Sequence, residues 1–281
     1  TKIVLCKNME KFHLQVFLNI VGIGSASGLL FHNNSLFIIS DNSSYLYQYT
    51  IETEKLDKIA LMENPMKNTP KKQKLDFESI TKNENKLYLF GSGSKENRNL
   101  MMTYHLENQK IKQKDLSKLY IELRKVGNLK EDELNIEGAI SIEDTMYLFQ
   151  RGNGGTGKNG LFIVEDDKTK PIYFHSISLP KINSVAYTFT DAILVHDKFY
   201  FLASAENSNS TYLDGEIFGS LVGILNPKTF EIEQTIQISD QHKFEGITFY
   251  KESATEFEFL LCEDNDTEVL ESKIYKLKLM K

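Results

Sequence analysis

Five short segments of the chain each join a polar residue to a small residue and then an apolar one, and they recur at spacings of 51, 59, 54 and 54 residues. Their polar residues are Ser27, Glu78, Glu137, Asp191 and Glu245. Four carboxylates that meet in a narrow space repel one another and raise each other's pKa unless a cation neutralises them. The chemistry that this set predicts is therefore the binding of a metal ion.

The donor types indicate which ion that would be. Oxygen ligands without histidine or cysteine favour Ca²⁺ or Mg²⁺ over zinc, and a wide ring suits Ca²⁺, whose ligands lie at about 2.3 to 2.6 Å. We expect Ca²⁺ as the cofactor, bound by Ser27, Glu78, Glu137, Asp191 and Glu245. The alternative is a water-filled channel in which the acids are simply solvated. Because the acid recurs at one position of the repeat, the cation is the favoured reading.

A strongly apolar run follows each segment after a short polar turn. Continuous apolar runs of this length are typical of strands that are buried on both faces. The five runs are residues 36–39, 87–90, 146–149, 199–202 and 257–261. A unit of 50 to 60 residues that repeats five times predicts an all-β fold, a five-bladed β-propeller in one domain over residues 1–281.

Two other segments complete this predicted architecture. Residues 12–17 alternate in the manner of a strand and are expected to supply the outer strand of the fifth blade, which closes the ring and removes an open sheet edge. Residues 115–123 place Leu116, Leu119, Tyr120 and Leu123 on one helical face, which predicts a short surface helix between blades two and three.

The loops that leave the second strands are long, polar and rich in glycine, and propeller topology places them at the mouth of the channel beside the five polar residues. Long varied loops on a rigid scaffold are where binding usually occurs. We expect a small anionic ligand or substrate there. The candidate catalytic residues are Asp41, Glu78 and Arg151, and the candidate substrate-binding residues are Ser92, Ser94, Arg98, Asn153, Lys158, Glu206 and Asp264.

The glycine-rich stretch 152–159 is close to a phosphate-binding P-loop. Asn159 stands where that motif requires Ser or Thr, and an apolar strand follows instead of a helix. A flexible loop is the simpler reading, and a backbone contact to an anion, assisted by Arg151 and Lys158, is the alternative.

Two further motifs are incomplete. Residues 264–268 resemble the start of an EF-hand, but Val269 replaces its glycine and Tyr275 its final glutamate, which favours a solvated loop or ligand contacts. The chain has no Gly-x-Ser-x-Gly segment, and its six histidines lie in turns or on unrelated strands, His32 and His196 among the turn residues, so a serine-hydrolase triad is disfavoured.

Composition excludes several classes of partner. The net charge is -6, which offers no basic surface for nucleic acid or an anionic membrane, and no apolar run is long enough to span a bilayer. Cys6 and Cys262 are too few for a disulfide framework. We expect a monomer. Because the chain starts at Thr1, a removed leader or tag is expected, and a periplasmic or secreted location is favoured over the cytoplasm.

The segments that open the blades resemble those of the soluble calcium-activated nucleotidases, the five-bladed apyrase family. The segments that carry this resemblance are residues 27–29, 40–41, 47–48, 77–78, 136–137, 189–191 and 243–247, and residues 119–127 resemble a helical insertion of that family. The resemblance implies a central Ca²⁺ ion held by Ser27, Glu78, Glu137 and Glu245. Asp191 departs from the family, which has Ser there. Asp41 and Arg151 have counterparts, whereas the loops 91–99 and 206–219 do not.

The overall pattern is also similar to an uncharacterised group of bacterial propellers described as phytase-like. The segments 76–78, 91–94, 150–154 and 189–192 carry this similarity. Membership in that group implies the propeller fold and no established activity.

Two functions compete on this basis. The first is a calcium-dependent hydrolase of phosphate esters or anhydrides, in which Asp41 or Glu78 orients water and Arg151 or Arg98 stabilises charge. The second is a non-catalytic binding propeller with a structural Ca²⁺ ion and a glycan or peptide ligand. A lactonase or esterase of the kind found on six-bladed propellers is disfavoured by the count of five units. The positions of Arg98, Arg151 and Lys158 relative to the acids distinguish the first two.

Overall fold

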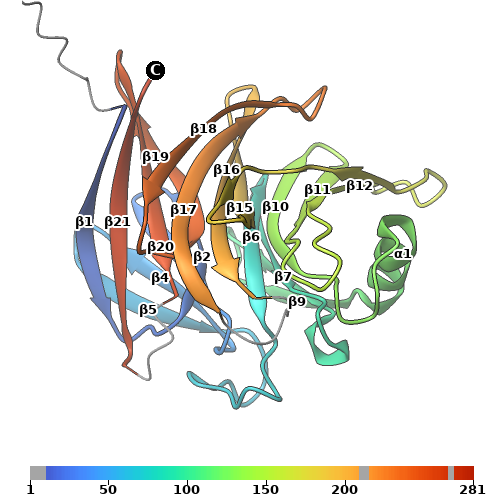
Figure 1. The fold of residues 1–281 in the computed structure, drawn as a ribbon. Helices are drawn as coiled ribbons and strands as arrows, with labels where there is room; N and C mark the ends of the chain where they lie inside the picture. Colours follow the sequence, from blue (N-terminus) through green and yellow to red (C-terminus); the bar gives the residue numbers. More distant parts are fainter. Residues whose placement is uncertain (1–10, 209–214, 265–268) are drawn as a thin grey trace, which may run out of the picture.

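The computed structural model describes residues 11–208, 215–264 and 269–281, and these form five antiparallel sheets arranged around a centre (Figure 1). Blades are numbered here in chain order. Blade 1 contains β2 (Ala26–His32), β3 (Ser35–Ser40), β4 (Tyr45–Thr50) and β5 (Lys55–Ala60). Blade 2 contains β6 (Phe77–Asn83), β7 (Lys86–Gly91), β8 (Leu100–His105) and β9 (Ile111–Asp115). Blade 3 contains β10 (Ile136–Ile142), β11 (Thr145–Gln150), β12 (Gly160–Glu165) and β13 (Tyr173–Ser176).

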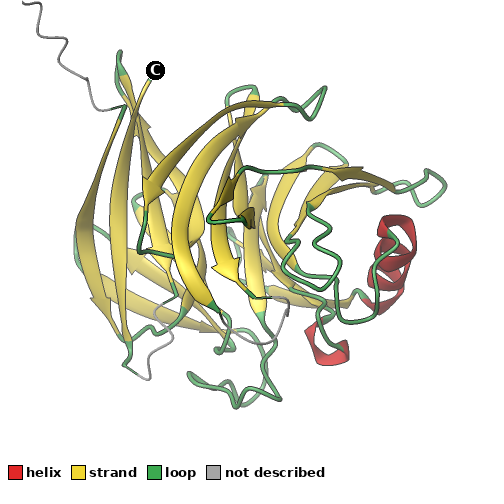
Figure 2. Cartoon of the chain, viewed as in Figure 1, coloured by secondary structure: helices red, strands yellow, loops and turns green. Residues whose placement is uncertain are grey.

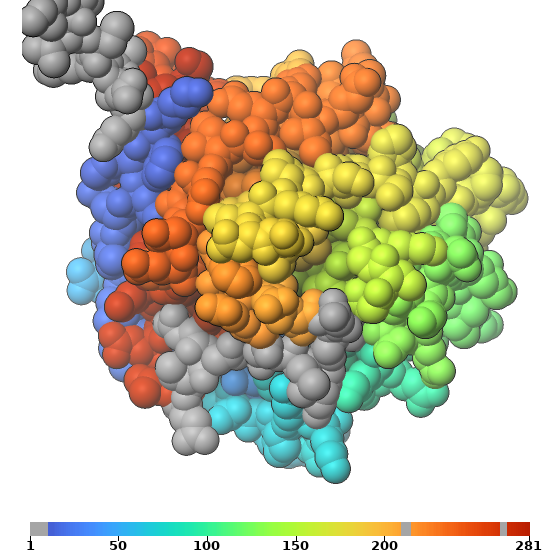
Figure 3. Space-filling model, in the orientation of Figure 1, coloured from blue at the N-terminus to red at the C-terminus, as the bar shows by residue number. Residues whose placement is uncertain are grey.

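Blade 4 has five strands and blade 5 draws on both ends of the chain. Blade 4 contains β14 (Lys181–Ile182), β15 (Val185–Val195), β16 (Lys198–Asn207), β17 (Glu216–Leu225) and β18 (Ile232–Ser239). Blade 5 contains β19 (Phe244–Glu252), β20 (Glu256–Glu263), β21 (Glu271–Met280) and, outermost, β1 (Phe12–Val21). The expected closure by the N-terminal strand is confirmed, and β1 lies beside β21 in Figure 1 and Figure 3.

The apolar core consists of five layers, each between two neighbouring blades. The second strands supply much of it, because both of their faces pack against a neighbour; β3, for example, is buried along its whole length. Strands make up nearly all of the regular structure (Figure 2). The predicted all-β five-bladed propeller is therefore confirmed.

The predicted helical insertion is confirmed, with its observed boundaries a little later in the chain. The helix α1 (Ser117–Gly127) follows β9 and buries Tyr120 and Leu123 against blades 2 and 3. Tyr120 donates a hydrogen bond to the Gly91 carbonyl oxygen at 2.7 Å. One 3-10 turn, η1 (Glu96–Arg98), was not expected from the sequence. In the part of the chain that the structure describes, no helix has the length and apolar character needed to cross a bilayer.

Five strands, one from each blade, line the centre: β2, β6, β10, β15 and β19. The small residue that follows each of the five polar residues named in the sequence analysis lets these strands approach one another closely. A Cβ atom added at Gly246 would lie 2.9 Å from the Cα atom of Gly28, and one added at Gly138 would lie 2.9 Å from the backbone nitrogen of Ala192. The recurring polar-small pattern thus has a packing cause: the inner strands meet directly below the polar residues.

Candidate functional site

All five inner strands contain a β-bulge, an extra residue that interrupts the pairing with the second strand. In four blades the bulged residue is the predicted one, namely Ser27, Glu78, Glu137 or Glu245. Bulges re-aim side chains and often occur beside functional sites. The repeat found in the sequence therefore corresponds to one structural position, which we call the ring position.

In blade 4 the ring position is occupied by Thr190, not Asp191, and this corrects the alignment made from the sequence. The register shifts between Phe189 and Asp191, so Thr190 is the bulged residue. Asp191 accepts hydrogen bonds from the backbone N–H groups of Ala192 at 2.7 Å and Ile247 at 2.8 Å. Both of its carboxylate oxygens are therefore engaged in joining β15 to β19. Burial raises its pKa well above the ordinary value.

The two hydroxyl residues at the ring position link neighbouring blades. Ser27 donates to the carbonyl oxygen of Phe77 at 2.5 Å, and Thr190 donates to that of Phe244 at 2.7 Å. In both cases the acceptor directly precedes the ring glutamate of the next blade. The two hydroxyls thus fix the backbone that carries Glu78 and Glu245.

Three carboxylates from blades 1 and 2 form a compact group, which we call the acidic cluster: Asp41, Asp76 and Glu78. One oxygen of each lies within 4.8 Å of one oxygen of each of the others. Asp41 directly follows β3, Asp76 directly precedes β6, and Glu78 occupies the bulge of β6. The cluster therefore lies at the mouth, where the second strand of blade 1 ends and the first strand of blade 2 begins.

Asp76 is held by a buried network made of three residues that the sequence assigned to substrate binding. It accepts hydrogen bonds from Arg98 Nη1 at 2.7 Å and from Ser92 Oγ at 2.5 Å. Ser94 Oγ in turn accepts from Arg98 at 2.8 Å. Ser92, Ser94 and Arg98 are at most 5% exposed. The structure brings these three side chains together, and the group that they bind here is the chain's own carboxylate.

The carboxylates of Asp41 and Glu78 have fewer hydrogen-bond partners than the carboxylate of Asp76. Lys74 Nζ lies 2.5 Å from Asp41 Oδ2, while the buried Asp41 Oδ1 has no hydrogen-bond partner in the described part of the chain. Burial, reinforced by Asp264 and opposed by Lys74, raises the pKa of Asp41 to about 7. Burial, followed by the charges of Glu137 and Asp76, raises the pKa of Glu78 well above its ordinary value. Among the described residues, none donates a hydrogen bond to the Glu78 carboxylate.

These features fit a divalent cation. A Ca²⁺ ion with ligands at about 2.3 to 2.6 Å spans roughly 5 Å between opposite oxygens, so the separations within the acidic cluster are compatible with one shared ion. An ion there would also give the orphaned Asp41 Oδ1 a partner and relieve the repulsion on Glu78.

The opposite half of the mouth balances its charge internally. Arg151 places Nη1 3.2 Å from Glu137 Oε1 and Nη2 2.5 Å from Glu206 Oε2. Lys243 places Nζ 2.8 Å from Glu245 Oε1 and 3.7 Å from the same Glu206 oxygen. Two cations therefore serve three carboxylates in a chain of ion pairs. Arg151 and Lys243 therefore supply the positive charge beside Glu137 and Glu245 that the sequence analysis expected from a metal ion.

The pKa shifts on this half follow from the same contacts. Burial raises the pKa of Glu137 although Arg151 and Lys243 oppose it, and the same two cations outweigh burial at Glu206 and lower its pKa. Burial is likewise the largest cause of the strongly raised pKa of Glu245, and Lys243 opposes it.

Two more predicted ligand-binding residues lie near the ring, and one predicted motif lies outside the described chain. Asn153 Oδ1 accepts from Asn135 at 3.2 Å, and Asn135 also donates to Glu137 at 2.8 Å. Asp264 raises the pKa of both Asp41 and Glu245 by its charge, and so acts on both halves of the mouth. Residues 265–268, the rest of the EF-hand-like segment, are outside the described residues.

Lys158 and the glycine-rich loop have structural partners away from the ring. Lys158 donates to the carbonyl oxygens of Gly127 at 3.2 Å and of Asn128, which satisfies the C-terminus of α1. The backbone N–H of Thr156 donates to Glu133 Oε1 at 2.9 Å, and the N–H of Lys130 donates to Oε2 at 2.8 Å. The loop does bind a carboxylate through its backbone, and that carboxylate is Glu133 of the same chain.

We expect Glu133→Gln to lower the free energy of unfolding by about 1 to 2 kcal/mol, because hydrogen bonds to charged groups contribute roughly 1.5 to 3 kcal/mol each and the amide keeps one acceptor. These hydrogen bonds outweigh burial and lower the pKa of Glu133. Urea unfolding followed by circular dichroism measures the change. Glu131→Gln is the control, because its side chain is exposed; an equal loss in both variants would contradict the assignment.

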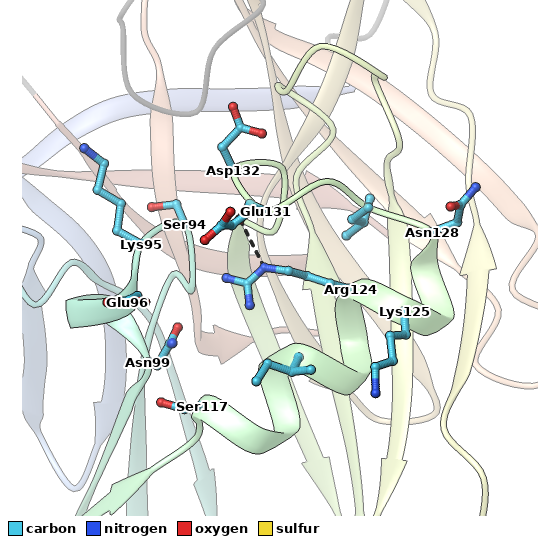
Figure 4. Close-up of a pocket in the computed structure, with 12 residues that line it drawn as sticks. Ser94, Lys95, Glu96, Asn99, Ser117, Arg124, Lys125, Asn128, Glu131 and Asp132 are labelled. Atoms are coloured by element: carbon cyan, nitrogen blue, oxygen red, sulfur yellow. Dashed lines mark hydrogen bonds between the residues drawn. The ribbon is translucent and has the colours of Figure 1, made fainter.

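A polar groove of about 880 Å³ lies beside the mouth, between η1 and α1 (Figure 4). Arg124 reaches across it from α1 and donates to the Glu131 carbonyl oxygen at 3.1 Å. Of the predicted substrate-binding residues, Ser94 lines this groove. The groove thus adjoins the network that holds Asp76.

Sequence reasoning missed a second layer of polar residues, two positions before each ring position: Ser25, Asp76, Asn135, Thr188 and Lys243. Asn135 and Lys243 contact the ring glutamate of their own blade, and Thr188 Oγ1 lies 3.3 Å from Arg151 Nε. Side chains two apart in a strand point to the same face. The signal was therefore present in the sequence as a polar residue at the second position before each bulge.

Known proteins show the fold and the family. The major allergen Mala s 1 of Malassezia sympodialis is similar in structure, with a TM-score of 0.56, 10% sequence identity, and coverage of 92% of this chain and 95% of that chain. A member of the DUF4221 family from Bacteroides vulgatus gives a TM-score of 0.46 at 11% identity, over 96% of this chain and 99% of that chain. The likeness to Mala s 1, at 10% identity, shows the fold alone.

No curated protein matches the sequence. No apyrase or phytase family was identified, and nothing found conflicts with membership in an uncharacterised family. A family model described as "Family of unknown function (DUF6929)" matches residues 22–279. The five blades and the mouth residues fall almost entirely within that match. The chain therefore belongs to the DUF6929 family.

Proposed function

We propose that this protein is a calcium-dependent binding propeller that holds Ca²⁺ at the acidic cluster and uses it to bind a small anionic ligand at the mouth. The observation that carries this proposal is the unsatisfied state of two of the three carboxylates. Among the described residues, the buried Asp41 Oδ1 has no hydrogen-bond partner, and the half-buried Glu78 carboxylate has no donor. Carboxylates that are partly withdrawn from water without a full set of partners are costly, and a bound cation is the usual remedy.

The residues around the cluster are suited to that role. Arg98 and Ser92 bind one oxygen of Asp76, and Lys74 binds one oxygen of Asp41, so each carboxylate is oriented while its other oxygen stays available. Ca²⁺ takes six to eight oxygen ligands. Three carboxylates therefore leave coordination positions for water or for the oxygens of an anionic ligand.

Ring residues Glu137 and Glu245 are assigned a different role in this proposal. Because Arg151 and Lys243 already neutralise them, these two are expected to shape the floor of the mouth instead of binding the ion. The full-ring site of Ser27, Glu78, Glu137, Asp191 and Glu245 remains the alternative arrangement for the same cation.

Calorimetric titration of chelator-treated protein with Ca²⁺ tests this assignment. Wild-type protein should bind one ion, and Glu78→Gln or Asp41→Asn should weaken binding at least tenfold, a loss of about 1.4 kcal/mol or more. Glu137→Gln is the matched control: a ring glutamate replaced by the same amide should leave affinity within about threefold if its charge belongs to Arg151. Full affinity in Glu78→Gln would overturn the proposal, and equal losses at Glu78 and Glu137 would favour the full ring.

Hydrolysis of phosphate esters or anhydrides is the second candidate function. The observation in its favour is that Arg98 and Arg151, two permanently charged groups, lie against the mouth carboxylates instead of pointing to solvent. A bound Ca²⁺ would supply polarisation of a phosphoryl oxygen. Both guanidinium groups are engaged by carboxylates, which favours binding over hydrolysis. Release of phosphate from ATP, ADP and phytate, measured with Ca²⁺ and with chelator, separates the two functions.

A further inference from the structure

Three residues from blade 5 form a hydrogen-bonded chain at the mouth-facing end of its strands. His242 Nδ1 lies 2.7 Å from Glu263 Oε2, and Tyr275 donates through its hydroxyl to Glu263 Oε1 at 2.6 Å. His242 precedes β19, Glu263 ends β20, and Tyr275 lies in β21. Glu263 and Tyr275 are 7% and 5% exposed, so the carboxylate that contacts the histidine is itself fixed and buried.

The imidazole is held from several sides and its outer edge remains accessible. The backbone N–H of His242 donates to Ser239 Oγ at 2.9 Å, and its carbonyl oxygen accepts from Ser220 Oγ at 2.7 Å. The ring packs against Tyr275 with centroids 5.2 Å apart. The side chain is 37% exposed, and Nε2 has no partner among the described residues.

This arrangement differs from that of the other five histidines in the chain, all of which are described. His196 also contacts a glutamate, at 3.1 Å, but through Nε2 and on the surface, where both partners are well exposed. His13 contacts only the exposed Gln15. His242 is thus the histidine whose ring is oriented by a buried carboxylate, and His196 is a natural comparison within the same molecule.

The position of the pair connects it to the charged mouth. Lys243, the next residue after His242, forms ion pairs with Glu206 and Glu245. Asp264, the next residue after Glu263, acts by its charge on Asp41 and Glu245. His242 therefore lies at the rim formed by the same segments that supply the mouth residues.

We propose that His242 is a general base at this rim, positioned by Glu263 and Tyr275, and that it activates a water molecule for attack on an acyl carbon, with a small ester as the probe of this activity. With Nδ1–H donated to Glu263, the lone pair of Nε2 points away from the carboxylate and can accept a proton. Burial and the contact with Glu263 raise the pKa of Tyr275, which keeps its hydroxyl protonated as the donor to Glu263.

The chemical step balances without any further reactant than water. Nε2 removes a proton from a water molecule whose oxygen bonds to the acyl carbon, and Glu263 stabilises the imidazolium that forms. The bond from the acyl carbon to the alcohol oxygen then breaks, and the imidazolium returns the proton to that oxygen. The products are a carboxylic acid and an alcohol, with no change in oxidation state.

Hydrolysis of p-nitrophenyl acetate by the full chain is the first test. His242→Gln should lower the protein-catalysed rate about 10²-fold, since general acid–base groups contribute roughly 10² to 10⁴. His196→Gln should keep the wild-type rate. Equal rates in wild type and His242→Gln, or equal losses in the two variants, would overturn the proposal. Because Ca²⁺ affinity is measured separately on the same variants, failure here leaves the calcium proposal standing.

Chemical reactivity provides a second test that needs no activity. At pH 7.5, diethyl pyrocarbonate followed by peptide mass spectrometry should modify His242 faster than His196, although exposure alone, 37% against 58%, favours His196. Glu263→Gln should remove this advantage and should also abolish the preference of His242 for the Nδ1–H tautomer in its ¹⁵N NMR spectrum. A slower reaction at His242 than at His196, or an unchanged tautomer in Glu263→Gln, would show that the pair is only structural.

Discussion

Replacing Arg151 by glutamine is expected to lower the free energy of unfolding by about 3 to 5 kcal/mol, which is the usual effect of removing one partner from a buried ion pair. Arg151 is 3% exposed and binds both Glu137 and Glu206. Without it, three buried carboxylates, Glu137, Glu206 and Glu245, are left around Lys243, and at least one of them must take up a proton or draw water into the core. The instability therefore comes from the charges that are left behind.

Urea unfolding followed by far-ultraviolet circular dichroism is the suitable measurement, because the chain has no tryptophan. Arg151→Lys should fall between wild type and Arg151→Gln, since an ammonium keeps the charge but lacks the fork that reaches two carboxylates. Lys158→Gln is the control and should lose no more than about 1 kcal/mol, the usual range for a cation near a helix C-terminus. If Arg151→Gln lowers the free energy of unfolding by less than about 1 kcal/mol, the chain of ion pairs does not stabilise the mouth as proposed.

The chelator-treated protein should be more stable at pH 5 than at pH 8, and Ca²⁺ should raise the stability most at the alkaline end. Asp41, Glu78, Asp191 and Glu245 all have raised pKa values when folded. The folded state therefore holds protons that the unfolded state has released, and stability falls as the pH rises through this interval. For Asp41, the rise from 3.8 to about 7 corresponds to on the order of 4 kcal/mol by pH 7.

Groups that make the folded state more stable as the pH rises act mostly outside the interval from pH 5 to pH 8. The carboxylates with lowered pKa values, such as Glu133 and Glu206, titrate below pH 5. His32, whose pKa is lowered chiefly by burial, acts in the opposite direction within the interval. Calorimetric melting at pH 5, 6, 7 and 8, with chelator and with Ca²⁺ at a hundred times its dissociation constant, should show a calcium gain of about 2.7 kcal/mol at pH 8. Stability that increases from pH 5 to pH 8 in chelator would contradict the raised pKa values of these four carboxylates.

The fold was predictable because one physical pattern repeats. Each blade needs a small residue at the closest approach of the inner strands and an apolar second strand between its neighbours, as Gly28 and residues 36–39 show in blade 1. Closure by residues 12–17 was predictable because blade 5 lacked an outer strand. The helix after β9 was predictable from its apolar face, although Ser117 and not Asp115 begins it.

Where the sequence misled, local geometry was the cause. A bulge adds one residue that apolar alternation does not reveal, and the alignment therefore selected Asp191 instead of Thr190. The contacts of Arg151, Lys158 and Glu133 join segments that are far apart in the chain, so neither their partners nor their distances follow from spacing. Asp76 of the acidic cluster could have been predicted, because it lies two residues before Glu78 and side chains two apart in a strand point to the same face.

The pairing of β1 with β21 has a consequence for biosynthesis. Blade 5 unites the first and last strands described in the chain, so blades 1 to 4 can assemble while β1 stays unpaired until β21 has been synthesised. The ion-pair chain from Arg151 to Lys243 and the rim histidine both require blade 5. Chains that lack blade 5 should therefore expose Glu137 and Glu206 to water, and the mature mouth should form only after β19 to β21 have been synthesised and the ring has closed.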